Sequence, residues 1–348
     1  MKAIILVGGQ GTRLRPLTDR IPKNVVPLCN VPFLAYPISR LKKAGVKEIV
    51  FSVGYKPEVI RGIFRDGRKW GVPIRYAVET EPLGTAGAVK NAERFVKGHP
   101  CFVLNGDILT DIDLKAQAAF HRKNRALATL GLVRVPDPSA YGLVVLDRKG
   151  RVDRFIEKPS QEETVTDTIN AGVYLFEPEV FDAIPAGQNY STERALFPGL
   201  LNAGKPLFGF VWEGYWQDIG TPRKYLSSQW DVLSGRFPVL GKYRKDRQGV
   251  HWGRNVKRAK GAVVNGPVIV GNGCILEEGA RILPYTVLGD GCRVGKGAVL
   301  SKCLLWPGAD TGDHTTLSEV ILGSECRLGN ATRLEPGSVV VDSKRKRK

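Results

Sequence analysis

The C-terminal part of the chain repeats every six residues, and no other feature restricts the fold as strongly. Aliphatic side chains recur without a break at positions 264, 270, 276, 282, 288, 294 and 300, and the spacing resumes at 322, 328, 334 and 340. A period of six fits neither an α-helix, whose period is about 3.6, nor a simple alternating strand, whose period is about two. The segment is therefore expected to consist of small structural units that stack on one another.

Small side chains follow the aliphatic ones at a distance of four residues. They are Cys274, Ala280, Thr286, Cys292, Ala298, Cys326, Thr332 and Ser338. Hexads of this kind are typical of a left-handed parallel β-helix, in which three hexads make one triangular coil and stacked coils bury a column of aliphatic residues. We therefore expect a β-helix over 262–342, with three of its cysteines acting as small interior apolar residues.

The two runs of the repeat are out of phase, because 22 residues separate Leu300 from Leu322. This number is not a multiple of six. We therefore expect an irregular coil, or a loop that leaves the β-helix, over 301–321. This stretch contains Trp306, Pro307 and His314.

The first 235 residues alternate short apolar runs with helical patterns, which predicts an α/β fold with a Rossmann-like mixed sheet and helices on both faces. In such folds ligands bind outside the carboxyl ends of the strands. The loops that follow 3–7 and 101–104 are therefore candidate binding segments. Candidate strands cover 3–7, 48–53, 74–78, 101–104, 128–133 and 173–176, and candidate helices cover 33–44, 57–65, 85–94 and 114–124.

The net charge of +18 on 348 residues is concentrated in two places. Eight Lys or Arg face one Asp over 242–260, and five more form the tail 344–348. We interpret these as a solvated basic linker over 236–261 and a basic tail over 343–348. Weak, salt-sensitive binding to anionic polymers is the alternative, and no specific nucleic-acid site is expected.

The six cysteines include no C-x-x-C pair, and only four histidines accompany them. This spacing argues against a zinc site, and the chain's size argues against a disulfide framework. The apolar run at 3–7 is too short for a signal peptide, and no segment approaches the roughly 20 apolar residues of a membrane span. We expect a cytoplasmic protein with no membrane partner.

The segment "LVGGQGTRLRPLT" (6–18) follows the first candidate strand. It lacks the lysine that a P-loop requires after Gly11, and Leu14 stands where a dinucleotide-binding loop needs its third glycine. Glycines at 8, 9 and 11 let backbone N–H groups approach an anion, and Arg13 and Lys23 add positive charge. The loop is therefore a candidate phosphate-binding segment, with a plain strand-to-helix connection as the alternative.

The continuation G-G-x-G-T-R-L-x-P-L-T…P-K resembles the sugar-phosphate nucleotidyltransferases. Further segments occur in that family's order: "EPLGTAGA" (81–88), "LNGD" (104–107), "YG" (141–142), "FIEKP" (155–159), "NAGVY" (170–174) and "WQDIGTP" (216–222). The resemblance extends over the whole chain. It implies transfer of a nucleoside monophosphate from a nucleoside triphosphate to a sugar 1-phosphate, with release of pyrophosphate.

The resemblance also implies roles for individual residues. Asp107 and Asp218 would hold Mg²⁺, Arg13 and Lys23 would bind the triphosphate, and Lys158 would bind the sugar 1-phosphate. The attacking phosphate oxygen is already ionised, so no general base is needed. The nucleotide would contact Leu6, Gly8, Gly9, Gly11, Thr12, Arg13, Lys23, Glu79, Pro82, Gly84, Thr85, Gly106 and Asp107. The sugar phosphate would contact Gly142, Glu157, Lys158, Asn170 and Gly172.

Glu79 bears on the choice of base. Guanine presents two adjacent N–H donors that one carboxylate can accept, whereas uracil and thymine present an acceptor beside a donor and suit an amide. Thymidylyl members of the family tend to have glutamine here, so Glu79 favours GTP, with a solvated glutamate at a strand end as the alternative. "STERALFPGLL" (191–201) resembles the members that act on mannose 1-phosphate, and GDP-mannose would be their product.

Other functions stay open at this stage. Within the family, the alternative is uridylyl or thymidylyl transfer to glucose 1-phosphate. A non-catalytic paralogue that senses nucleotide sugar is disfavoured, because the charged motif residues are all present. An added acyltransferase activity would need a histidine base, and His314 is the only histidine within the repeats. We expect the β-helix to support a homo-oligomer.

Overall fold

The structure of the chain is a computed structural model that describes residues 1–157, 159–160 and 162–341. It divides into two compact units. The first contains residues 1–10 and 34–217, and the second contains 11–33 and the chain from 218 onward. Within the described residues, no helix has the length and apolar character needed to cross a membrane.

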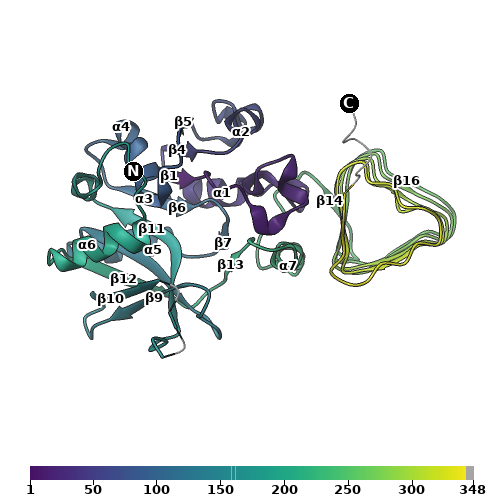
Figure 1. Cartoon of the computed structure of the whole chain (residues 1–348). Coiled ribbons are helices and arrows are strands. Elements are labelled where there is room, and N and C mark those ends of the chain that lie inside the picture. The colour runs from purple at the N-terminus through teal and green to yellow at the C-terminus, as the bar shows by residue number, and fades with distance from the viewer. Residues whose placement is uncertain (158, 161, 342–348) are drawn as a thin grey trace. The chain divides into compact units, whose positions relative to one another are not determined.

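A nine-stranded mixed sheet forms the centre of the first unit (Figure 1). Its order is β10-β9-β11-β6-β1-β4-β5, and β8 lies between β11 and β12. β1 is parallel to β4 and β6, whereas β11 is antiparallel to β6. The strands are β1 (Lys2–Leu6), β4 (Glu48–Val53), β5 (Ile74–Val78), β6 (Cys101–Asn105), β8 (Ala128–Arg134), β9 (Gly142–Leu146), β10 (Val152–Glu157), β11 (Thr168–Phe176) and β12 (Leu207–Trp212).

Helices and short strands complete this unit. Ala3, Ile4 and Ile5 of β1 are completely buried, although successive side chains in a strand point to opposite faces. Both faces of the sheet are therefore covered, as predicted. The helices are α1 (Ala35–Lys43), α2 (Pro57–Phe64), α3 (Gly84–Asn91), α4 (Glu93–Val96), α5 (Leu114–Asn124) and α6 (Phe197–Asn202), and β7 (Ile108–Thr110) pairs with β13 (Trp216–Asp218).

Three sheets of mostly parallel strands make up the β-helix of the second unit, which Figure 1 shows as a triangle. Val250 pairs with Val268, and Val268 pairs with Thr286, so one regular coil has 18 residues or three hexads. The parallel β-helix is therefore confirmed. Its strands are β14 (Arg244–Lys245), β15 (Val250–Trp252), β16 (Lys257–Arg258), β17 (Val263–Val264), β18 (Val268–Val270), β19 (Ile275–Leu276), β20 (Arg281–Ile282), β21 (Thr286–Leu288), β22 (Arg293–Val294), β23 (Val299–Ser301), β24 (Leu304–Leu305), β25 (Thr316–Ser318), β26 (Ile321–Leu322) and β27 (Val339–Val340).

The phase change in the repeat comes from two shortened hexads. Leu300 pairs with Leu317, and Leu305 pairs with Leu322, so these coils have 17 residues instead of 18. Five residues instead of six separate Leu300 from Leu305, and the same holds between Leu317 and Leu322. The expected irregular coil is present. Its strands stay in the sheets, so no loop leaves the β-helix over 301–321.

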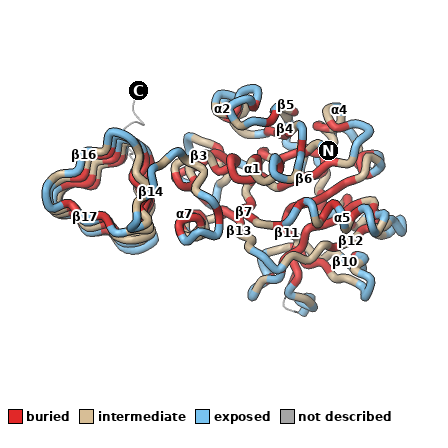
Figure 2. The backbone as a smooth tube through the Cα atoms, turned by 180° about the vertical axis from the view of Figure 1, so that it is seen from behind, coloured by how far each residue is buried: buried red, intermediate tan, exposed pale blue. Residues whose placement is uncertain are grey.

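The interior of the β-helix is as the repeat predicts up to Cys326, whereas Leu328, Leu334 and Val340 near its C-terminal end are only partly buried. The aliphatic column from Val264 to Leu300 and the small residues Cys274 and Cys292 are buried, and Cys326 is 2% exposed. All six cysteines lie within the described residues, where they are buried and form no disulfide. Figure 2 shows the buried residues along the coils and along the central sheet of the first unit.

The basic segment over 236–261, which we expected to be a linker, instead supplies the first turn of the β-helix. β14 pairs with β15, and β15 and β16 pair with β18 and β19 of the next coil. The hexad pattern is hidden here because Arg258 occupies the position that Leu276 takes one coil later. Its guanidinium stays exposed and donates to the carbonyl of Ala262.

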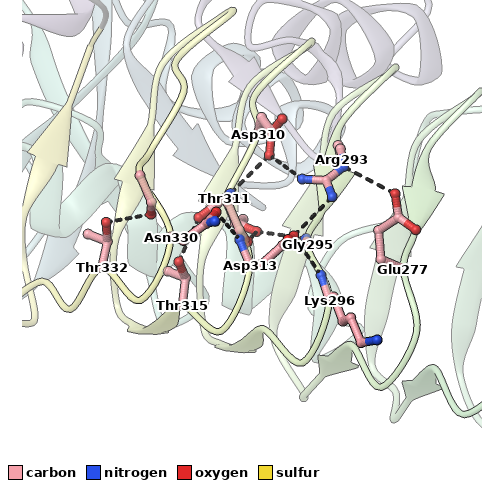
Figure 3. A network of polar contacts seen from close by, with 12 residues as sticks. Glu277, Arg293, Gly295, Lys296, Asp310, Thr311, Asp313, Thr315, Asn330 and Thr332 are labelled. Carbon is pink, nitrogen blue, oxygen red and sulfur yellow. Dashed lines mark hydrogen bonds and ion pairs between the residues drawn. The ribbon is translucent and has the colours of Figure 1, made fainter.

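Polar side chains on the outside of the β-helix connect three successive coils (Figure 3). The guanidinium of Arg293 donates to Glu277 at 3.1 Å, to Asp310 at 3.2 Å and to Asp313 at 2.9 Å. Each of these side chains is about one-third exposed. The ladder therefore fixes the stacking more than it adds stability, since exposed ion pairs contribute little.

The β-helix also packs against segments that are distant in sequence but belong to the same unit. These are α7 (Pro222–Leu233) and the hairpin of β2 (Pro27–Leu28) and β3 (Val31–Pro32). Trp306 donates its indole N–H to the hydroxyl of Tyr225 at 3.1 Å, and the amide of Asn30 donates to the carbonyl of Leu288 at 2.7 Å. Residues 11–33 and 218–235, which we assigned by sequence to the catalytic domain, therefore form one compact unit with the β-helix.

Candidate functional site

Three loops begin at one edge of the first unit's sheet. β1 is parallel to β4 and β6, and β4 is parallel to β5, so the carboxyl ends of these strands meet there. The N–H of Gly106 donates to the carbonyl of Leu6 at 2.9 Å, and the N–H of Glu79 donates to that of Val53 at 2.9 Å. The structure therefore brings the glycine loop, Glu79 and the segment that carries Asp107 to one edge, where ligands bind in such sheets.

The carboxylate of Glu79 packs directly against the glycine loop. A methyl group built on Gly8 would lie 3.0 Å from Oε1 of Glu79, so the absence of a side chain makes room for the carboxylate. The N–H of Leu83 donates to Oε2 at 3.3 Å. Burial raises the pKa of Glu79 above its ordinary value, and hydrogen bonds from Leu83 and Ser52 offset part of this rise. Its role in base recognition stays a prediction.

Contacts from residues 188–193 fix the "EPLGTAGA" segment. Gly84 has φ +67°, and a methyl group there would lie 2.8 Å from both Oδ1 of Asn189 and the carbonyl oxygen of Tyr190. This backbone conformation and this close approach both require glycine. The amide of Asn189 also donates to the carbonyl of Pro82 at 3.0 Å. Pro82, Gly84 and Thr85 are therefore placed by a segment about 100 positions later.

The sugar-side segment "NAGVY" forms an irregularity in β11. The pairing of β11 with β8 shifts register between Asn170 and Tyr174. Gly172 has φ +66°, and its N–H donates to Oδ1 of Asn170 at 3.1 Å. A methyl group on Gly172 would lie 2.5 Å from the amide nitrogen of Asn105, two residues before Asp107. The structure thus brings the sugar-side and metal-side segments together.

Gly142 and Glu157 are paired residues at the ends of β9 and β10. A methyl group on Gly142 would lie 2.8 Å from Oε2 of Glu157, so this carboxylate covers the glycine as Glu79 covers Gly8. The next residue, Lys158, lies outside the described residues. Its role stays a prediction.

The remaining phosphate-binding candidates lie in the second unit. Gly11 has φ +66°, and a methyl group there would lie 2.9 Å from Cβ of Lys23. The hydroxyl of Thr18 donates to the carbonyl of Gly11 at 2.8 Å. Thr12 and Arg13 follow in a short 3-10 helix, Thr12–Leu14. The fold therefore places the stem of Lys23 against Gly11, next to Thr12 and Arg13.

Asp218 and Arg13 meet around Gly220 within this unit. The side chain of Asp218 is 12% exposed, forms an ion pair with Lys224 and accepts the N–H of Gly220 at 3.1 Å. A methyl group on Gly220 would lie 2.5 Å from Oδ2 of Asp218 and 3.1 Å from a guanidinium nitrogen of Arg13. Thr221, whose hydroxyl accepts the N–H of Lys224, begins α7 and so fixes this turn.

Asp107 and Asp218 have the right chemistry for a divalent cation. Carboxylate oxygens are the ligands that Mg²⁺ prefers, and one or two of them suffice when phosphates and water complete the shell. Over residues 1–157, 159–160 and 162–341, no group of three or more His, Cys, Asp or Glu side chains could hold a metal ion without phosphate ligands. A cation at Asp218 would share its carboxylate with Lys224. The identity of the metal stays a prediction.

The sequence reasoning did not single out Glu193 or Tyr174. Glu193 lies in a π-helix, Thr192–Leu196, and accepts a hydrogen bond from the hydroxyl of Thr85 at 2.9 Å. The two residues are 108 positions apart, so no local pattern predicts their contact. The signal in the sequence is the segment "STERALFPGLL", which contains Glu193. The structure adds a π-helical turn, and such turns frequently occur at functional sites.

Comparisons with known proteins agree with the family that the sequence motifs indicate. A family model described as Nucleotidyl transferase matches residues 2–235, and one described as GMPPB C-terminal domain matches 264–345. The chain is 42% identical over 303 residues to a mannose-1-phosphate guanylyltransferase of Mycobacterium tuberculosis, covering 86% of this chain and 83% of the relative. It is 34% identical over 352 aligned residues to a UTP–glucose-1-phosphate uridylyltransferase of Synechocystis, covering 94% and 88%.

A solved structure supports the match in three dimensions. The crystal structure of HddC from Yersinia pseudotuberculosis complexed with GMP-PN superposes with a TM-score of 0.56 at 29% identity, over 66% of this chain and 97% of that one. The ordered motifs, the glycine loop at the carboxyl edge of the sheet and these matches agree. The chain therefore belongs to the nucleotidyl transferase family and is a nucleotidyltransferase enzyme.

Proposed function

We propose that this enzyme transfers GMP from GTP to mannose 1-phosphate, forming GDP-mannose and pyrophosphate. The single observation that carries the choice of GTP is the carboxylate of Glu79, which lies against Gly8 of the glycine loop. The relative from Mycobacterium tuberculosis, which bears the name of this activity, supports the choice of both substrates.

The reaction joins two phosphates by direct displacement. A phosphate oxygen of mannose 1-phosphate forms a bond to the α-phosphorus of GTP, the bond from that phosphorus to the α,β-bridging oxygen breaks, and pyrophosphate leaves. The nucleophile is ionised at neutral pH, so the enzyme's contribution is to position the phosphates and stabilise their charge. Arg13 and Lys23 would bind the triphosphate, and Lys158 would bind the sugar phosphate.

Asp107 and Asp218 would hold Mg²⁺. When bound, the ion supplies neutralisation of phosphate charge and polarisation of the reacting phosphoryl group. Arg13 lies next to Asp218 at Gly220, so the second unit presents a cation and a carboxylate together. This pairing of opposite charges suits a site that binds a phosphate and its counter-ion at once.

Base recognition would follow from the acceptor capacity of Glu79. An ionised carboxylate has about four acceptor positions, and the donors of Leu83 and Ser52 use two of them. The remaining positions can accept the N1–H and N2–H donors of guanine. On the sugar side, Gly142, Glu157, Asn170 and Gly172 would contact the hydroxyl groups, and the choice of mannose rests on the resemblance and on the relatives.

A second candidate is uridylyl transfer from UTP to glucose 1-phosphate. The 34% identity to the Synechocystis enzyme favours it. Against it stands the carboxylate at position 79, because uracil presents an acceptor beside a donor and a carboxylate can satisfy only the donor.

Product analysis tests the proposal. The full chain is incubated with GTP, mannose 1-phosphate and Mg²⁺, and GDP-mannose and pyrophosphate are quantified in the same samples. We expect the two products in equal amounts, and none when EDTA is present. Failure to form GDP-mannose, together with formation of UDP-glucose from UTP and glucose 1-phosphate, would replace the proposal with the second candidate.

Two further assignments stay proposals. A homo-oligomer formed through the β-helix can be tested by light scattering of the purified chain. A cytoplasmic location rests on the sequence pattern and can be tested by cell fractionation.

A further inference from the structure

A chain of hydrogen bonds connects the nucleotide-side segment with the sugar-side segment within the first unit. The hydroxyl of Thr85 donates to Oε2 of Glu193 at 2.9 Å. The hydroxyl of Tyr174 donates to Oε1 of Glu193 at 3.5 Å, and the amide of Asn170 donates to the hydroxyl oxygen of Tyr174 at 2.8 Å. The N–H of Gly172 completes the chain by donating to Asn170 at 3.1 Å.

The hydrogen bonds in this series run toward the carboxylate of Glu193: each donor bonds either to Glu193 itself or to the next residue on the way to it. Tyr174 is completely buried, and burial raises its pKa far above the ordinary value, so its hydroxyl keeps the proton that it donates. The hydroxyl of Ser191 also donates to Oε2, at 3.1 Å. Glu193 therefore divides its two oxygens among three hydroxyl donors, and the bond to Tyr174 is the longest of the three.

Both ends of the chain are held by these bonds. The proton of Thr85 is committed to Glu193, and its oxygen accepts the N–H of Thr192 at 2.7 Å. On the other side, Asn170 uses its oxygen for Gly172 and its nitrogen for Tyr174. The orientation of each substrate-side group thus depends on how the carboxylate of Glu193 is shared.

We propose that Glu193 is a positioning residue that couples the two substrate segments, so that occupation of one segment increases the affinity of the other for its substrate. A nucleotide that moves Thr85 shifts Oε2 of Glu193. Because the carboxylate is rigid, Oε1 moves with it, and the long Tyr174–Glu193 bond has room to shorten. Tyr174 then holds Asn170 and the turn at Gly172 more firmly. The identity of the two substrates rests on the proposed function, but the coupling does not.

Tyr174→Phe removes the middle link of this series of hydrogen bonds and leaves the bonds at both ends intact. The ring of Tyr174 stacks on Phe176 with centroids 5.5 Å apart and meets Phe197 edge-on at 5.4 Å, and phenylalanine keeps both contacts. Glu193→Gln is the second variant, because it keeps the size of the side chain and removes the charge. Tyr76→Phe is the matched control, since the hydroxyl of Tyr76 donates to the backbone carbonyl of Arg65 and takes no part in these hydrogen bonds.

The test measures coupling instead of activity. Calorimetry gives the dissociation constant of a GTP analogue with an α,β-methylene bridge, alone and with saturating mannose 1-phosphate. It then gives the dissociation constant of mannose 1-phosphate, alone and with the saturating analogue. Each pair of constants gives one ratio. The two ratios must agree if they report one coupling. We expect the wild-type enzyme and Tyr76→Phe to show coupling of at least about fivefold. In Tyr174→Phe and Glu193→Gln the ratio should fall to about one.

A merely structural role for Glu193 predicts a different result, since both affinities would weaken while their ratio stayed the same. An unchanged ratio in both variants, or a ratio of one in the wild-type enzyme, would overturn the proposal. If the wild-type enzyme turns over UTP and glucose 1-phosphate instead, the proposed function fails. The coupling is then measured with the UTP analogue and glucose 1-phosphate, so the two failures are distinguishable.

Discussion

The substitution Glu79→Gln replaces one carboxylate oxygen with an NH₂ group and so tests whether the carboxylate recognises guanine. The side chain keeps its size, so its packing against Gly8 is retained, and the amide oxygen can still accept the N–H of Leu83. The other end of the side chain becomes an NH₂ group. Guanine would then meet a donor at one of the two positions where the carboxylate supplies an acceptor.

The magnitude follows from the bonds that change. One charge-assisted hydrogen bond contributes about 1.5–3 kcal/mol, and leaving a donor unpaired costs a similar amount. A tenfold change in kcat/KM corresponds to about 1.4 kcal/mol, so kcat/KM for GTP should fall by roughly 10- to 150-fold. For UTP it should stay constant or rise, because an amide can match both the acceptor and the donor of uracil.

Steady-state kinetics at saturating mannose 1-phosphate measures both values. Glu81→Gln is the control, since Glu81 lies two residues away in the same loop and is exposed. We expect its kcat/KM for GTP to match the wild-type value. If Glu79→Gln changes kcat/KM for GTP by less than about threefold, the carboxylate does not read guanine and the argument for GTP fails.

The other predictions concern pH, the metal ligands and the β-helix. Because the pKa of Glu79 lies above its ordinary value of 4.5, protonation should begin at a higher pH than for an exposed glutamate, and KM for GTP should rise as the pH falls from 7 toward 5. This rise should be absent in Glu79→Gln. Asp107→Asn should lower kcat by about 100-fold or more, measured as pyrophosphate release, and a change below tenfold would refute its role. Leu276→Ala empties part of the buried column and should lower the free energy of unfolding by about 2–5 kcal/mol in urea titrations. The half-exposed Val263→Ala should change it by no more than about 0.5 kcal/mol.

The β-helix could be predicted from the sequence because each of its contacts repeats at a fixed spacing. One coil covers the next, so a column such as Val264, Ile282 and Leu300 is visible as a period in the sequence. Prediction failed where a charged and exposed residue stands at a position of the aliphatic column. Arg258 occupies the aliphatic column in the first turn, so that turn was taken for a linker.

The first unit was predictable where strands are buried on both faces. The bounds of β4, β5 and α5 agree with the prediction, whereas β9, β10 and β12 were missed. β10 is mostly exposed or half-buried, so its apolar pattern is weak. Motifs pointed to the loops of the candidate site, but contacts such as Gly172 with Asn105 or Thr85 with Glu193 join distant positions and required the structure.

The sequence also did not indicate that the candidate site residues belong to different compact units. Arg13, Lys23 and Asp218 belong to the unit that contains the β-helix, whereas Glu79 and Asp107 belong to the unit with the central sheet. The reason is packing: α7 and the hairpin β2-β3 contact the β-helix through side chains such as Tyr225 and Asn30. A single boundary in the sequence cannot describe two units that each contain two separate segments of the chain.

Competition in one vessel tests the central claim most directly. The full chain is given equal concentrations of GTP, UTP, dTTP and ATP together with equal concentrations of mannose 1-phosphate and glucose 1-phosphate, and the nucleotide sugars are quantified by mass spectrometry at early times. We expect GDP-mannose to be the main product. A mixture dominated by UDP-glucose or dTDP-glucose would contradict it.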